Sequence, residues 1–160
     1  MLKKIKFGSL FFSILLPLVV GSATSLVVTH FSSFDPYEYM PAITPPSIVF
    51  VIVWTVLYVL MGVSSYLINN HSEATEEELK QANSTYFYSL AVNVIYCLTF
   101  FIFKWTLLSF FVCLYLAILV LQTIGQYFHI KKIAAYLQIP YFLWCCFASI
   151  LTFMVWWLNW

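Results

Sequence analysis

The segment TLLSFFVCLYLAILVLQTIGQYF, residues 106–128, contains no charged side chain. Its hydrophobicity is continuous rather than alternating, and its length is close to the ~20 residues that a helix needs to cross the hydrocarbon core of a bilayer. A bilayer core holds no water to satisfy backbone N–H and C=O groups, so a spanning segment of this kind must be helical. The segment therefore predicts a transmembrane helix.

Four further apolar stretches lie on either side of this segment, and all seven Lys and all six Asp or Glu residues lie outside the five. The sequence therefore predicts an all-α membrane protein, a five-transmembrane-helix bundle in one membrane-embedded domain. Ser72 or Thr75 can cap the third helix, so that helix is expected to begin before its apolar stretch, which starts at Tyr86. The predicted helices span about 7–29, 47–68, 79–103, 106–128 and 133–158.

The composition excludes several functional classes. The chain is 63% hydrophobic and only 8% charged, whereas roughly a quarter of the residues in a soluble domain are charged. A formal net charge of +1 argues against nucleic acid as a partner. The expected partners are therefore lipid-soluble or membrane-bound. Because no Asp, Glu, Lys or Arg lies in any of the five apolar stretches, ion-coupled transport is disfavoured.

The distribution of lysines predicts the orientation. A cytoplasmic N-terminus puts six lysines inside and only Lys104 outside, as the positive-inside rule favours, and the C-terminus then lies outside. The chain is expected in a bacterial cell membrane. The four cysteines lie in apolar stretches without the spacing of a metal site, so no metal and no cofactor is predicted.

Residues 30–46 contain Pro36, Pro41, Pro45 and Pro46. Four prolines restrict the backbone more than a flexible linker would need. We therefore expect this segment to form an ordered cover over one end of the bundle.

In three of the predicted helices, sets that contain at least one aromatic residue recur at helical spacing. One face of each helix carries such a set: Trp54 and Tyr58; Asn93, Tyr96 and Phe100; Trp144, Ala148 and Leu151. Asn93 is expected to face the bundle interior, since a buried amide in lipid needs a partner. Spacing alone leaves two interpretations open, ordinary helix packing and a ligand pocket.

The order of several short motifs resembles the translocator protein family, also called tryptophan-rich sensory proteins or peripheral benzodiazepine receptors. The similar segments are Pro41-Ala42-Ile43-Thr44-Pro45-Pro46, then Val53-Trp54 with Leu57-Tyr58 and Gly62, and finally Pro140-Tyr141-Phe142-Leu143-Trp144 with Phe147 and Ala148. Asn93 falls where the family commonly has Asn in its third helix. The resemblance covers nearly the whole chain.

The resemblance implies a five-helix bundle, often a homodimer, whose pocket lies beneath the loop between the first two helices. Members bind porphyrins such as protoporphyrin IX, sterols and synthetic ligands. Trp54 and Trp144 match two pocket tryptophans that are linked in bacterial relatives to light-dependent porphyrin breakdown, and only in that case would they be catalytic. Ala148 and Leu151 match further pocket positions, and Pro45 and Pro46 lie at the pocket's loop.

The chain departs from the family pattern at three places. Ile43 replaces a usual Trp, Thr152 replaces a usual Asn, and the acidic residue common near Val112 and Cys113 is missing. These departures put the ligand preference in doubt. We therefore expect a membrane receptor or sensor for porphyrin-type and other hydrophobic ligands. The alternatives are a light-dependent porphyrin-degrading enzyme and a facilitated transporter of hydrophobic ligands.

Overall fold

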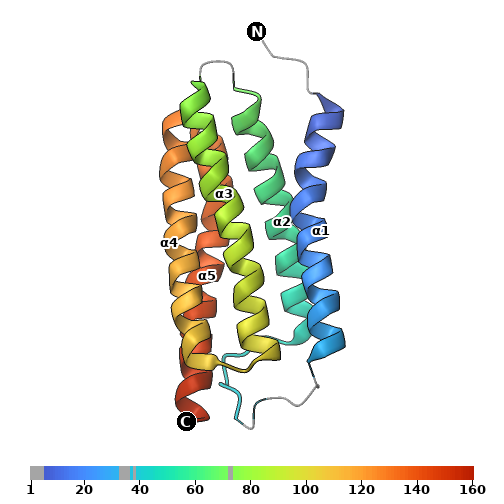
Figure 1. The fold of residues 1–160 in the computed structure, drawn as a ribbon, viewed down its shortest axis with the longest axis vertical. Coiled ribbons are helices and arrows are strands. Elements are labelled where there is room, and N and C mark those ends of the chain that lie inside the picture. The colour runs from blue at the N-terminus through green and yellow to red at the C-terminus, as the bar shows by residue number, and fades with distance from the viewer. Residues whose placement is uncertain (1–5, 33–36, 38, 72–73) are drawn as a thin grey trace.

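The structure, a computed structural model of the chain, describes residues 6–32, 37, 39–71 and 74–160. Within those ranges it contains five α-helices and one π-helical turn (Figure 1). All five helices are long and apolar enough to cross a membrane, which confirms the predicted all-α bundle. The elements are α1 (Phe7–Phe31), α2 (Ser47–Asn69), α3 (Glu76–Cys97), the π-helical turn η1 (Leu98–Ile102), α4 (Thr106–Ile130) and α5 (Lys132–Leu158).

Helix α3 begins at Glu76, three residues before the predicted start. Thr75 is its cap: the Thr75 hydroxyl accepts the Glu78 backbone N–H at 3.2 Å, and the Glu78 carboxylate accepts the Thr75 N–H at 2.8 Å. This capping box satisfies two backbone donors at the helix start, so the helix extends beyond its apolar stretch. Ser72, the other candidate cap, lies outside the described residues.

The end of the third span departs from the prediction of a plain helix. The Phe103 N–H donates to the Leu98 carbonyl at 3.1 Å, a bond across five residues that defines the π-helical turn η1. Lys104 then adopts a φ of 53°, in the left-handed region that non-glycine residues rarely occupy. The chain turns there into α4. Short π-helical turns within α-helices are frequent at functional sites.

The five helices run alternately up and down, so the start of α1 and the end of α5 lie at opposite ends (Figure 1). Each helix packs on its neighbours in the order α1, α2, α5, α4, α3, and α1 also contacts α3. One end, called the lysine end below, holds Lys6, Lys80, Lys131 and Lys132. The other, the loop end, holds Lys104 and the described residues of the segment 30–46.

Helix α1 lies at the edge of the bundle, and Pro17 is its one buried residue. Two glycines allow α1 and α2 to approach closely. A Cβ added at Gly62 would lie 2.4 Å from the Cα of Ile14, and one added at Gly21 would lie 2.1 Å from the Tyr58 ring. Small residues permit such backbone contact in membrane bundles.

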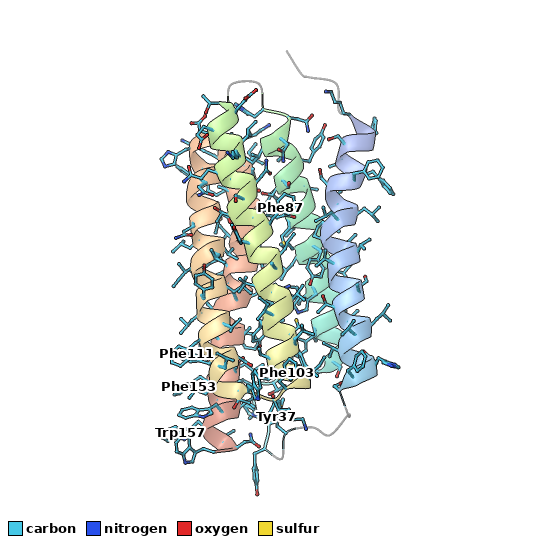
Figure 2. The ribbon with its side chains drawn as sticks, in the orientation of Figure 1. Tyr37, Phe87, Phe103, Phe111, Phe153 and Trp157 are labelled. Atoms are coloured by element: carbon cyan, nitrogen blue, oxygen red, sulfur yellow. The ribbon has the colours of Figure 1, made fainter. Side chains whose placement is uncertain are left out.

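The expected cover is described only in part, because 33–36 and 38, which include Pro36, lie outside the described residues. The Tyr37 ring packs against Phe100 with a centroid separation of 5.2 Å (Tyr37 is labelled in Figure 2). The Tyr39 N–H donates to the Asn159 side-chain oxygen at 3.1 Å, and the Asn159 amide donates to the Tyr39 carbonyl at 2.8 Å. These contacts attach the segment to the third span and to the end of α5.

Candidate functional site

Trp54 and Tyr58 lie one turn apart on the same face of α2, as their spacing predicts. Their rings stack with centroids 5.3 Å apart and an angle of 28° between the planes. Tyr58 is buried and Trp54 is half-buried. The Trp54 ring also contacts Tyr141 of α5 edge-on, at 6.1 Å, so α2 and α5 are joined through aromatic rings.

Asn93 of α3 is 2% exposed and faces the bundle interior, as expected. Its amide donates a hydrogen bond of 3.3 Å to the Tyr58 hydroxyl. Its side-chain oxygen is buried and has no hydrogen-bond partner in the described part of the chain. Buried polar atoms are nearly always satisfied, so this unpaired acceptor is an exception within the bundle interior.

Trp144 of α5 is half-buried and lies between two phenylalanines. Its ring contacts Phe50 of α2 edge-on at 5.6 Å and Phe147 at 5.3 Å. Trp144 and Trp54 both pack against one buried cluster, which contains Tyr58 and Tyr141. The two indoles are thus attached to a common core from α5 and α2, and neither is fully exposed.

Tyr96 and Phe100 form a second aromatic group nearer the loop end. Their rings stack at 5.8 Å, and the Tyr96 hydroxyl shares a hydrogen bond of 2.9 Å with Thr152 of α5. Tyr37 covers this group from the loop: its hydroxyl donates to the Phe100 carbonyl, and burial raises the pKa of Tyr37 to about 12. The phenol therefore stays protonated, and able to donate, at neutral pH.

The predicted site residues fall into two adjoining groups. Trp54, Tyr58 and Trp144 belong to the central cluster, which Asn93 joins through its hydrogen bond. Tyr96 and Phe100 belong to the loop-end cluster, against which Ala148 packs. Leu151 is buried, Pro45 is half-buried, and Pro46 is the exposed N-cap of α2.

Spacing arguments missed two aromatic members of this region. Tyr37 lies in the loop, where no helical period applies, and the clustering of prolines around it was the available signal. Phe50 lies in the first turn of α2, one turn before Trp54, so its position on the same face could have identified it. Among the described residues, no group of three or more His, Cys, Asp or Glu side chains gathers as a metal site would need.

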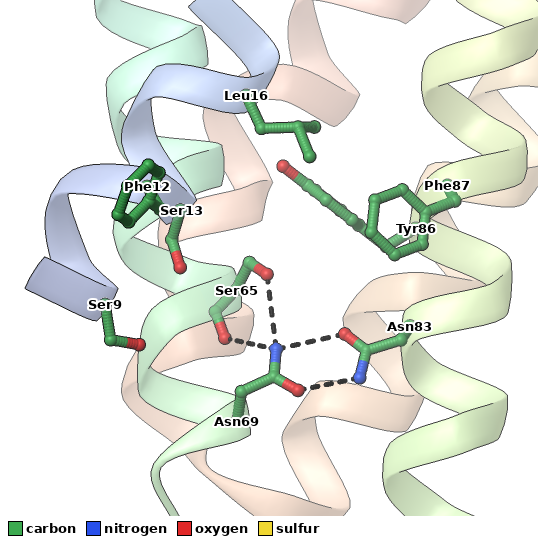
Figure 3. Close-up of a pocket in the computed structure, with 9 residues that line it drawn as sticks. All are labelled: Ser9, Phe12, Ser13, Leu16, Ser65, Asn69, Asn83, Tyr86 and Phe87. Atoms are coloured by element: carbon green, nitrogen blue, oxygen red, sulfur yellow. Dashed lines mark hydrogen bonds between the residues drawn. The ribbon is translucent and has the colours of Figure 1, made fainter.

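A cavity of about 500 Å³ lies elsewhere, between α1, α2 and α3 toward the lysine end (Figure 3). None of the ten predicted site residues lines it. Its polar walls include Asn69 and Asn83, which are joined by hydrogen bonds of 3.0 and 2.7 Å. No pattern in the sequence indicates this cavity, because Asn69 ends α2 and Asn83 lies about two turns into α3, where a polar residue near the end of a span is normally solvated.

Comparison with known proteins adds to this geometry. The sequence model of the TspO/MBR family matches residues 13–158. This chain belongs to the TspO/MBR family. Together with the five apolar helices, the family assignment makes the chain an integral membrane protein and confirms the resemblance found in its motifs.

Three relatives of this TspO/MBR family member are similar over most of its length. A protein named tryptophan-rich protein TspO from Archaeoglobus fulgidus is 32% identical over 92% of this chain and 94% of its own. Another of that name from Bacillus cereus is 29% identical, over 79% and 80%. A tryptophan-rich sensory protein from Cereibacter sphaeroides is 31% identical, over 72% and 70%. The names support a family of membrane sensors or receptors.

Proposed function

We propose that this TspO/MBR family member is an integral membrane receptor that binds porphyrin-type (tetrapyrrole) and other hydrophobic ligands among the aromatic residues of α2, α3 and α5. The observation that carries the proposal is the attachment of two half-buried indoles, Trp54 and Trp144, to one buried cluster from different helices. The unpartnered oxygen of Asn93 supplies a polar contact beside them.

Ring stacking would make this site bind planar ligands more tightly than non-planar ones. A tetrapyrrole has two large faces, and each aromatic pair adds ~0.5 to 1.5 kcal/mol beyond the burial of area. Several such pairs, together with area burial, support an affinity in the micromolar range, which corresponds to about 8 kcal/mol. Trp54, Tyr58, Tyr96, Phe100 and Trp144 offer these faces.

The carboxylates of a porphyrin require water or a cation, because a bare carboxylate is costly to bury. We place them at the loop end. Lys104 lies there, with its ammonium 6.0 Å from the centroid of the Tyr37 ring, and the segment containing Pro45 and Pro46 borders the same end. The macrocycle would then insert toward Trp54 while its acidic edge stays near solvent.

The proposal is tested by titrating the detergent-purified protein with protoporphyrin IX while tryptophan fluorescence is recorded. Trp144→Ala is expected to weaken binding by about tenfold, since it removes a stacking face and its buried area. Trp157→Ala, on an indole of α5 that is 69% exposed, is the matched control and should bind like the wild type. No quenching, or equal affinity in Trp144→Ala, would exclude this site.

The paired indoles also support a second candidate, light-dependent degradation of the porphyrin. Indoles beside an excited porphyrin can donate electrons or react with oxygen products. Replacement of both Trp54 and Trp144 by Phe keeps ring faces but removes the indoles. Loss of light-dependent porphyrin breakdown with retained binding would support an enzyme, and equal turnover in the double variant would eliminate the tryptophan mechanism.

The orientation belongs to the same proposal. We place the lysine end in the cytoplasm of a bacterial cell and the loop end outside. The support is the asymmetry of charge: Lys6, Lys80, Lys131 and Lys132 lie at one end and Lys104 at the other, as the positive-inside rule favours. The ligand would then enter from the outer side of the membrane.

A further inference from the structure

The cavity between α1, α2 and α3 is a separate feature from the aromatic residues toward the loop end. Its volume of about 500 Å³ lies within the ~300 to 1,000 Å³ typical of small-molecule sites. Hydroxyls, amides and aromatic rings line it, and none of its lining residues carries a formal charge. The residues that bear on what it would bind are Ser9, Phe12, Asn69, Asn83, Tyr86 and Phe87.

The polar wall of the cavity is the side-chain pair of Asn69 and Asn83. The Asn69 amide donates to the Asn83 oxygen at 3.0 Å, and the Asn83 amide donates back at 2.7 Å. The same Asn69 amide donates to the Ser65 carbonyl at 2.9 Å. An Asn side chain has two N–H donors and an oxygen with two lone pairs, so Asn83 keeps capacity for a further donor and acceptor bond.

Tyr86 supplies a second, independent sign of a ligand. Its side chain is 2% exposed, and its hydroxyl has no hydrogen-bond partner among the described residues. Figure 3 shows this hydroxyl pointing from α3 toward Leu16 of α1, on the inner side of the cavity. A buried hydroxyl without a partner is unfavourable. A bound molecule that formed a hydrogen bond with the Tyr86 hydroxyl would remove this cost.

The position and the charge of the cavity restrict that molecule. Phe12 and Phe87 line the cavity and are both exposed on the bundle surface, where lipid lies. The polar boundary is marked by Lys6, about one turn before Ser9, and by Glu76, about two turns before Asn83. A neutral lining does not compensate a buried phosphate or ammonium group, which disfavours charged headgroups.

We propose that this cavity binds a neutral glycerolipid, a mono- or diacylglycerol, whose free hydroxyl and ester carbonyl contact Tyr86 and Asn83. The acyl chain leaves the cavity between Phe12 and Phe87 and continues into the bilayer leaflet at the lysine end. This inference does not depend on porphyrin binding.

The test uses the full-length protein in detergent and a monoacylglycerol with a photoreactive diazirine in its acyl chain. Labelling is expected to saturate with lipid concentration and to map to α1 and α3 near Phe12 and Phe87. An unlabelled monoacylglycerol should compete, and a phosphatidylglycerol with the same chain should compete at least about tenfold less well. Non-saturating labelling, or equal competition by both lipids, would identify only the surrounding lipid layer and would overturn the proposal.

Tyr86→Phe removes one hydroxyl and keeps the ring. It is expected to weaken the apparent lipid affinity by about three- to tenfold, the effect of one hydrogen bond. Tyr88→Phe is the matched control, since Tyr88 lies on the same helix and is 64% exposed. Equal affinities in the two variants would overturn the assignment of Tyr86.

Ser9→Phe provides a variant that does not disturb the core. Ser9 is exposed on α1 and lines the cavity, so a larger ring there should fill the space and abolish saturable labelling. Porphyrin binding should be unchanged in this variant. Saturable labelling that survives the filled cavity would place the lipid elsewhere.

Discussion

Tyr58 connects three helices through one side chain. Its ring stacks on Trp54 within α2, its hydroxyl accepts a hydrogen bond from Asn93 of α3, and its edge lies against Gly21 of α1. Removing the Tyr58 hydroxyl therefore tests the hydrogen bond alone, whereas substitutions in the α1–α2 contact test packing.

Tyr58→Phe is expected to lower the free energy of unfolding by about 0.5 to 1.5 kcal/mol. The ring contacts remain, but the Asn93 amide loses its 3.3 Å hydrogen bond to the Tyr58 hydroxyl, while the Asn93 side-chain oxygen already has no partner among the described residues. Denaturation in mixed detergent micelles would measure the change. Tyr136→Phe, at a position that is 55% exposed, is the control, and equal stabilities would contradict a role for the hydroxyl.

Gly62→Ala is expected to destabilise the bundle by about 1 to 3 kcal/mol, as overpacking does. The added methyl would lie 2.4 Å from the backbone of Ile14, which a side-chain rotation cannot relieve, so α1 must move away from α2. Gly125→Ala has open space around the new methyl and should gain up to about 1 kcal/mol of helix propensity. The same unfolding measurement compares the two. A neutral Gly62→Ala would show that this contact does not hold the helices together.

At the scale of elements, the start of α3 depends on a local motif rather than on hydrophobicity. Thr75→Ala removes the capping hydroxyl and is expected to cost about 1 kcal/mol. The loss should concentrate in the first turn, where hydrogen exchange of the Glu78 and Leu79 amides would accelerate. Thr85→Ala, whose hydroxyl bonds within the helix to the Gln81 carbonyl, is the control. Unchanged exchange at Glu78 would contradict the capping box.

Helix positions could be predicted from the sequence because continuous hydrophobicity between charged residues leaves few choices for a spanning segment. Four helices begin and end within two residues of the predicted positions. The π-helical turn η1 could not be predicted, because the stretch Leu98–Ile102 is as apolar as the rest of the span. Phe100 of this turn packs in a cluster with Cys113 of α4 and Val155 of α5, and contacts between helices are not visible in the pattern of one segment.

The candidate site was predictable only within each helix. Spacing placed Trp54 with Tyr58, and Tyr96 with Phe100, on common faces, and both pairs are stacked. It could not show how α2 and α5 are rotated toward each other, so the contacts of Trp144 with Phe50 and of Trp54 with Tyr141 needed coordinates. The cavity at the lysine end lies between three helices, and no pattern on one helix could identify it.

At the scale of the whole molecule, the proposed orientation predicts that the chain's C-terminus lies outside the cytoplasm. Alkaline phosphatase joined after Trp160 should be active in a bacterial host, because that enzyme folds only outside the cytoplasm, and a green fluorescent protein at the same position should stay dark. Fusions joined after Lys132, one span earlier, should give the opposite pattern. A fluorescent fusion after Trp160 would reverse the proposed orientation.

The location of bound porphyrin can be read from the oxidation of the protein itself. Under brief illumination, bound protoporphyrin IX generates reactive oxygen close to its binding site, and mass spectrometry identifies which tryptophans gain oxygen. Trp157 and Trp160 are 69% and 89% exposed, and a dissolved, non-binding sensitiser should oxidise them first. With protoporphyrin IX we expect the half-buried Trp54 and Trp144 to be oxidised ahead of them. The same order of oxidation with both sensitisers would contradict a porphyrin bound between α2 and α5.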